Sequence, residues 1–323
     1  MSSWFLYIVI VVLLWAMTGI IYKMGIHKDA ETDISLKYSV SVGVVFFVIS
    51  VFYLVTRDEP FSIWISAARY WPMTAFGLIY FVINTISFNG YIYNEVAVES
   101  PIEGISGGTS VVLLIVVYLL MGRVDSVADL FTPLRTIGIL IILFSIIVLS
   151  FVRNREAGAD ESLEESSKKS WKRIGLGTLI FPVMFATVDA LETVVTGVCL
   201  DTTYGYSMPA ADSIIIVGME YSILAFGTWI YIYVKERRVY NPFLKENMPR
   251  LLGSVTDNVG IVFYSYAMAI DSVSTDPVLA VYPIVAMIGG RFILKEKVGR
   301  IQYITAICIV AGSVLVVADA ITV

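Results

Sequence analysis

The chain is poor in the residues that carry most catalytic and metal-binding chemistry. It has one histidine, His27, in a short loop, and two cysteines, Cys199 and Cys308, within apolar segments. A disulfide framework and a CxxC metal site are therefore excluded. No GxxxxGK[ST] phosphate loop is present, which argues against an ATP-driven pump within this chain. We expect no enzyme activity, no cofactor, no metal and no nucleic-acid partner.

Charge is also scarce. Asp, Glu, Lys and Arg make up 15% of the residues, whereas 58% are hydrophobic and the mean hydropathy is +0.81. A soluble domain carries about twice as much charge on its surface. The apolar residues form long runs, without the period-two alternation of a transmembrane barrel. The composition therefore predicts an all-α polytopic membrane protein with the lipid bilayer as its surroundings.

The hydropathy pattern predicts ten membrane-spanning helices. We place them at about 4–25, 34–55, 72–95, 101–121, 134–152, 174–198, 209–234, 249–270, 277–295 and 301–320. The polar stretch 153–173 is rich in charge and Ser, and is expected to be a solvated linker. It divides the chain into a first five-helix unit, 1–152, and a second, 174–323.

The two units show weak internal similarity. The segment "YFVINTISFNGYIY" (80–93) aligns without gaps on "GSVTDNVGIVFYSY" (253–266), which pairs Asn84 with Asp257 and Tyr91 with Tyr264. Because five is an odd number of spans, the second unit would enter the membrane from the opposite side. The sequence therefore predicts two inverted five-helix repeats (5+5), as in many secondary transporters with a binding site between the repeats.

The segment "PVLAVYPIVAMIGGRFILKEKVGRIQYITAICIVAGSVLVV" (277–317) resembles the end of EamA-like ten-helix permeases of the drug/metabolite transporter superfamily. The residues that carry the resemblance are Pro277, Pro283, Glu296, Gly312 and, in the first span, Trp15. The first unit lacks a counterpart of Glu296. The resemblance implies alternating access around a central cavity, with the fifth and tenth spans peripheral, in a prokaryotic cell membrane. It does not fix a substrate.

Acidic residues lie deep within the predicted spans, where a charge costs roughly 2.5–3.5 kcal/mol on insertion scales. They are Asp189, Glu192, Glu220 and Asp257, with Glu103 in the first turn of the fourth span. Asp189 and Glu192 are three residues apart, so they share one helix face. No Lys or Arg lies equally deep in these spans. The acids would therefore be protonated, hydrated, or paired with a cationic substrate, a coupled proton or Na⁺.

Aromatic rings interleave with these acids, and cations bind over the faces of such rings. The candidate lining residues, besides the acids, are Trp15, Tyr80, Asn84, Tyr91, Phe185, Tyr264 and Tyr282. Each ring has an ordinary alternative role in helix packing or in an interfacial belt. Glu103 could stabilise a helix N-terminus, and Glu220 could hydrogen-bond a neighbouring helix.

The pattern favours a secondary active transporter of a small organic cation, such as a choline-like amine or a guanidinium compound. It would act as a monomer or homodimer. The alternative is a proton-coupled exporter of amino acids, drugs or other metabolites, in which the buried acids carry protons only. A membrane enzyme or lipid-handling scaffold is disfavoured, because no nucleophile motif or metal-ligand cluster is present.

Overall fold

The computed structural model describes residues 3–25, 34–89, 105–124, 132–157, 168–279, 281–295 and 299–322. All of the regular elements within these ranges are helical. The long helices of the first half are α1 (Ser3–Gly25), α2 (Ile34–Val55), α4 (Trp71–Ser87), α7 (Ile105–Leu120) and α8 (Pro133–Ala157). Those of the second half are α9 (Lys168–Leu200), α10 (Ala210–Glu236), α11 (Met248–Ile270), α12 (Ser272–Leu279), α13 (Tyr282–Gly289) and α14 (Arg300–Thr322).

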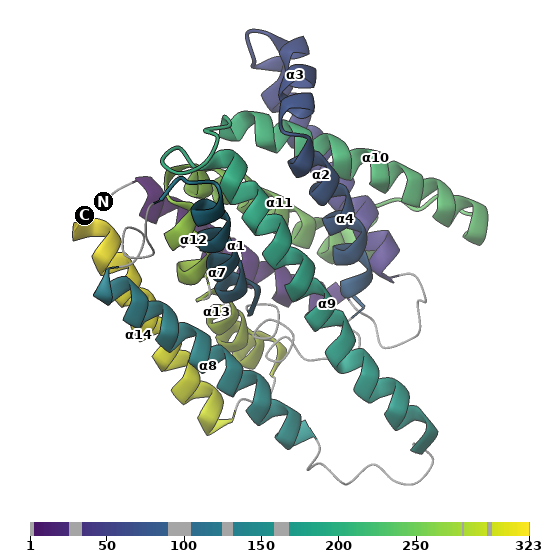
Figure 1. Cartoon of the computed structure of the whole chain (residues 1–323). Helices are drawn as coiled ribbons and strands as arrows, with labels where there is room; N and C mark the ends of the chain where they lie inside the picture. Colours follow the sequence, from purple (N-terminus) through teal and green to yellow (C-terminus); the bar gives the residue numbers. More distant parts are fainter. Residues whose placement is uncertain are drawn as a thin grey trace.

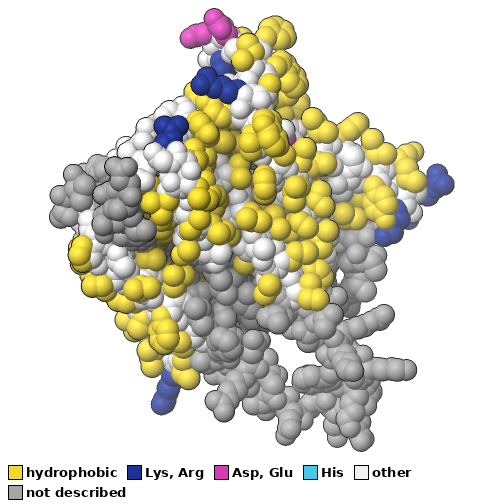
Figure 2. Space-filling view, viewed as in Figure 1, with side chains coloured by type: hydrophobic (Ala, Val, Ile, Leu, Met, Phe, Trp, Pro, Cys, Tyr) yellow, Lys and Arg dark blue, Asp and Glu magenta, His cyan; other side chains and the backbone are white. Residues whose placement is uncertain are grey.

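Several helices are long and apolar enough to cross a membrane: α1, α2, α10, the part of α9 from Val183 to Leu200, and the stretch Ser272–Leu294. Shorter apolar helices occur within α4, α7, α8 and α14. About half of each long span is buried, and large hydrophobic side chains cover much of the remainder. Figure 2 shows hydrophobic side chains spread over the middle of one face, with basic and acidic groups towards its margins. The protein is thus an all-α membrane protein.

The ninth predicted span begins at Ser272, five residues before the expected start. The Asp201 carboxylate accepts hydrogen bonds from the backbone N–H (3.0 Å) and the hydroxyl (2.6 Å) of Ser272, which caps the first turn of α12. Residue 280, between α12 and α13, lies outside the described residues.

The charged segment expected to be a solvated linker is partly helical. α8 continues to Ala157 and α9 begins at Lys168, so both helices extend into the range 153–173. A helix satisfies its own backbone hydrogen bonds in water as well as in lipid, so hydropathy alone does not mark where it ends. Residues 158–167 lie outside the described ranges.

Helices from the two halves pack against one another. α2 packs on α10, α1 on α11, α4 and α7 on α9, and α8 on α14. The last pair lies side by side at one margin of the molecule (Figure 1). Glycines permit close approach at this contact, because a Cβ on Gly138 would lie 2.6 Å from the Gly312 carbonyl oxygen. A short projecting element, η1 (Pro60–Ser62) and α3 (Ile63–Arg69), follows α2.

Candidate functional site

A cavity lies at the centre of the helix assembly. Its wall is formed by residues of α1, α4, α7, α9, α10, α11, α12 and α13, whereas no described residue of α2, α8 or α14 lines it. Its volume is about 130 Å³. The lining comes from both halves of the chain, so the cavity exists only when the halves are packed together.

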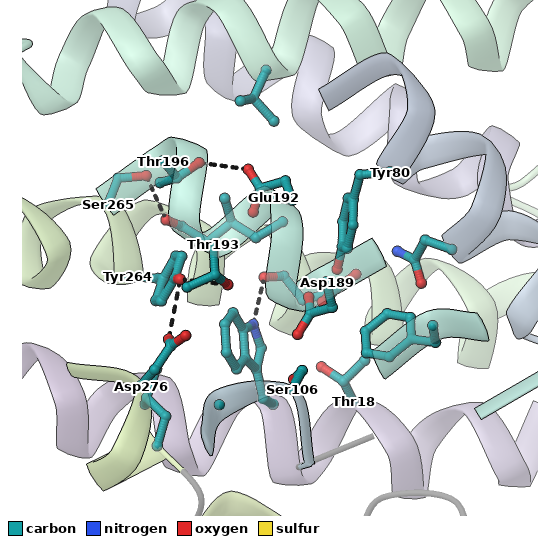
Figure 3. A pocket seen from close by; sticks show the side chains of 18 of the residues that line it. Thr18, Tyr80, Ser106, Asp189, Glu192, Thr193, Thr196, Tyr264, Ser265 and Asp276 are labelled. Atoms are coloured by element: carbon teal, nitrogen blue, oxygen red, sulfur yellow. Dashed lines mark hydrogen bonds between the residues drawn. The ribbon is translucent and has the colours of Figure 1, made fainter. Parts of the chain in front are cut away.

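Carboxylates from three helices meet in the cavity wall. Asp189 and Glu192 come from α9, Asp257 from α11 and Asp276 from α12. Glu192 accepts a hydrogen bond from the Thr196 hydroxyl one turn later (2.6 Å; Figure 3). The Asp257 carboxylate accepts one from Tyr38 of α2 (3.1 Å), so α2 supports the site from behind although it does not line the cavity. The acids expected on separate spans are therefore brought to one place by the tertiary structure.

Asp276 is an acid that the sequence analysis did not single out. Its carboxylate accepts hydrogen bonds from Ser110 of α7 (2.7 Å) and from the Tyr264 hydroxyl of α11 (3.1 Å; Figure 3). The Tyr264 hydroxyl also lies 3.2 Å from that of Thr193 on α9. Asp276 precedes Pro277, where the ninth span was expected to begin, so it was placed at a helix end. Because α12 begins at Ser272, Asp276 instead lies inside the protein.

Aromatic rings form a second part of the wall. The ring centroid of Trp15 lies 5.3 Å from that of Tyr264 and 5.8 Å from that of Tyr282. The Trp15 indole N–H donates to the backbone carbonyl of Asp257 (3.3 Å), which holds this ring beside an acidic residue. The ring centroids of Tyr80 and Phe185 lie 6.0 Å apart. Figure 3 shows Tyr80 beside Asp189.

Most residues proposed from the sequence lie in this wall: Trp15, Tyr80, Asn84, Phe185, Asp189, Glu192, Asp257, Tyr264 and Tyr282. Glu220 does not, because it is buried between α10 and α4. Tyr91 and Glu103 lie outside the described residues. The lining also includes polar residues that sequence reasoning missed: Thr18, Thr193, Ser213, Ser265 and Asp276. Thr193 follows Asp189 by four residues, so helical spacing could have identified it.

The described lining contains no Lys, Arg or His. The ion pairs found among the described residues lie elsewhere, at Lys37–Glu236 (2.9 Å), Arg57–Asp212, Arg135–Asp271 (3.8 Å) and Arg135–Asp319 (3.1 Å). Carboxylates removed from water without a counter-charge are unstable while ionised. The site is therefore chemically suited to a positively charged ligand, whose charge the carboxylates would balance and whose apolar surface the aromatic rings would contact.

Comparison with known proteins identifies the fold alone. No family model matches this chain, and no curated protein matches it. A solved structure described as "Crystal structure of protein" aligns with a TM-score of 0.62 at 13% sequence identity, covering 99% of this chain and 98% of that one. The chain is thus similar over its whole length to a protein of nearly equal size.

Proposed function

We propose that this protein is a secondary active transporter that moves a small organic cation across the membrane by alternating access. The observation that carries the proposal is the central cavity, whose wall combines Asp189, Glu192, Asp257 and Asp276 with the Trp15 and Tyr264 rings and has no basic side chain among its described residues. A cation, and especially an alkylated ammonium, would pair with the carboxylates of this wall and bind over its aromatic rings. A site for an anion would need donors or positive charge in place of these carboxylates.

The packing of the helices supports two inverted repeats. If the two halves are exchanged, α1 corresponds to α9 and α2 to α10. In the same way α4 corresponds to α11, α7 to α12 and α8 to α14. Under this exchange the contact of α1 with α11 becomes that of α9 with α4, and the contact of α1 with α12 becomes that of α9 with α7. Likewise α2 on α11 becomes α10 on α4, while α2–α10, α7–α12 and α8–α14 each map onto themselves. All of these contacts occur. A pseudo-twofold axis through the cavity explains the pattern.

This symmetry also gives a mechanism. Two repeats that pack by equivalent contacts have two arrangements of nearly equal energy, and the exchange between them opens the cavity first to one side and then to the other. Asp276 and Leu279 of α12 and Tyr282 of α13 line the cavity, so the ninth span takes part in this exchange. The α8–α14 pair lies outside the wall. This layout agrees with what the resemblance to the drug/metabolite transporter superfamily implies, and we include membership of that superfamily in the proposal.

The proposal is tested by binding and uptake of choline and guanidinium with protein in liposomes. We expect Asp189→Asn and Asp257→Asn each to weaken binding at least tenfold and to abolish uptake, while the protein still inserts. Asp58→Asn is the matched control, because this acid is exposed and remote from the cavity. Uptake at the wild-type rate by the Asp189→Asn/Asp257→Asn double variant would disprove the proposal.

The same experiment distinguishes the proposed cation transporter from the alternative, a proton-coupled exporter. If the acids carry protons only, a neutral or zwitterionic substrate still binds to the double variant, and the dependence of transport on pH disappears. A panel containing amino acids as well as amines, measured by thermal shift, distinguishes these outcomes, since a ligand that binds the folded protein raises its melting temperature by more as the ligand concentration exceeds the Kd.

A further inference from the structure

Glu220 differs from the other deeply buried acids in the described part of the chain. Its side chain is 6% exposed, and neither carboxylate oxygen has a hydrogen-bond partner among the described residues. By contrast, Asp201 accepts hydrogen bonds from Thr203, Tyr204 and Ser272. Buried acids that serve the fold are partnered in this way, as buried polar groups generally are. Glu220 therefore has no evident structural role in this state.

The side chain lies at the contact between α10 and α4. One carboxylate oxygen sits directly over Gly77, in the space that a Cβ would occupy. The Thr74 hydroxyl, one turn earlier on α4, faces Glu220, and it too makes no hydrogen bond of normal geometry among the described residues. Met73 and Tyr80 of α4 and Tyr221 of α10 line the cavity, so Glu220 is placed directly behind the cavity wall.

The titratable groups around this part of α10 are acidic or neutral. Glu192 of α9 is the charged side chain whose field acts on Glu220, and Tyr221 is the adjacent residue on α10. The charge of Asp257 on α11 acts on the hydroxyl of Tyr221, which belongs to the same turn of α10 as Glu220. α2 meets this turn with Phe46 and Ser50, which do not titrate, and α4 meets it with Phe81 and Gly77. Arg57, near the start of α10, is engaged by Asp212.

An ionised carboxylate in this position would be buried without a counter-charge among the described residues, with the Thr74 hydroxyl as the donor that faces it, which is strongly unfavourable. A neutral carboxyl group is far less costly there. We propose that Glu220 is the binding site of a coupled proton, separate from the carboxylates that hold the organic cation. This inference rests on the proposed function, to which it adds the coupled ion: the transport would be proton–cation exchange.

Glu192 provides the coupling. While the cavity is empty, its negative field favours the protonated form of Glu220. A cation bound beside Glu192 offsets that field, so the Glu220 carboxyl releases its proton to water and becomes a carboxylate. The charged form cannot remain buried against Gly77, and the α4–α10 contact must open to hydrate it. Because linkage between two binding sites is reciprocal, a bound proton weakens cation binding by the same factor.

The first test measures protons released when choline binds to the purified full-length protein in weakly buffered detergent. We expect release by the wild type, and an apparent Kd for choline that tightens by up to about tenfold per pH unit as pH rises through the titration of Glu220. Glu220→Gln should bind choline with much weaker pH dependence and release fewer protons. Glu246→Gln, which alters an exposed acid, should behave as the wild type. Wild-type proton release by Glu220→Gln would overturn the inference.

The second test does not require substrate binding, and Glu220→Asp supplies a readout of its own should Glu220→Gln fail to fold. Infrared difference spectra of the ligand-free protein, recorded between two pH values, should contain a protonated-carboxyl band that Glu220→Gln removes and Glu220→Asp shifts. If both variants leave the spectra unchanged, Glu220 does not titrate and the inference fails. If the band behaves as expected but no cation binds to the wild type, the proposed function fails while Glu220 remains a proton site.

Discussion

The Tyr264 hydroxyl donates a hydrogen bond to the Asp276 carboxylate over 3.1 Å, and both residues line the central cavity. Tyr264 belongs to the continuous helix α11, whereas Asp276 belongs to α12, which ends three residues later. The bond therefore ties α12 to α11 at the cavity surface. The Trp15 ring, 5.3 Å from that of Tyr264, connects the same pair to α1.

Removing this hydrogen bond should weaken the site. Tyr264→Phe keeps the ring and deletes the hydroxyl, so Asp276 retains the hydrogen bond from Ser110. A hydrogen bond to a charged group contributes about 1.5–3 kcal/mol, and we expect the Kd for choline to rise by about tenfold or more. The measurement is calorimetric titration. Tyr266→Phe is the control, because that hydroxyl bonds Tyr53 outside the cavity wall. An unchanged Kd in Tyr264→Phe would show that Asp276 does not depend on this donor.

The Trp15 ring should contribute to cation affinity specifically. Trp15→Leu removes the aromatic face but keeps an apolar side chain, and a cation–π contact contributes about 0.5–2 kcal/mol. We expect weaker binding of tetramethylammonium but little change for neutral tert-butanol, each measured by competition with labelled choline. Trp64→Leu, at an exposed position on α3, should change neither value. Equal losses for both ligands would indicate a packing role in place of cation binding.

Gly260 should be essential to the geometry of the site. A Cβ at this position would collide with the Trp15 indole nitrogen, so Gly260→Ala must displace that ring and break its hydrogen bond to the Asp257 carbonyl. Overpacking costs about 1–3 kcal/mol, and we expect both a lower melting temperature and weaker choline binding. Gly227→Ala on α10 is the matched control, since nothing lies within 4 Å of its Cβ. A fully stable, fully active Gly260→Ala would contradict this arrangement.

The α8–α14 contact should affect stability without affecting the site. Gly312→Ala places a Cβ 2.7 Å from the Gly138 carbonyl oxygen and 2.8 Å from Ile142, which forces the two helices apart. We expect a lower melting temperature in detergent with the Kd for choline unchanged, because neither helix lines the cavity. Loss of choline affinity in protein that remains folded would show that this pair is coupled to the site.

The orientation in the membrane can be tested by labelling. Lys and Arg gather in the ranges 153–173 and 235–250, and the positive-inside rule places both in the cytoplasm. In a Cys199→Ala/Cys308→Ala background, a cysteine at Ser166 should then resist a membrane-impermeant maleimide in intact cells, and one at Asp58 should react. The reverse labelling pattern would place the chain ends in the cytoplasm.

The membrane helices were predictable because burial in lipid is a local property of sequence. Each span must be apolar over its own length, whatever its neighbours are, so the expected and observed bounds of α1, α2 and α10 agree closely. The ninth span was less predictable. Its start depends on a cap from Asp201, about seventy residues away in sequence, and hydropathy carries no information about such a partner.

The candidate site divides in the same way. The sequence by itself determined that Asp189, Glu192, Glu220 and Asp257 lie in apolar helices without equally deep basic residues, and that the first two share a face. Only the tertiary structure decided that Asp276 joins Asp189, Glu192 and Asp257 at one cavity, while Glu220 turns away to Gly77. The physical reason is that a helix fixes the direction of a side chain relative to its own axis, but the packing of the other helices decides what that direction meets.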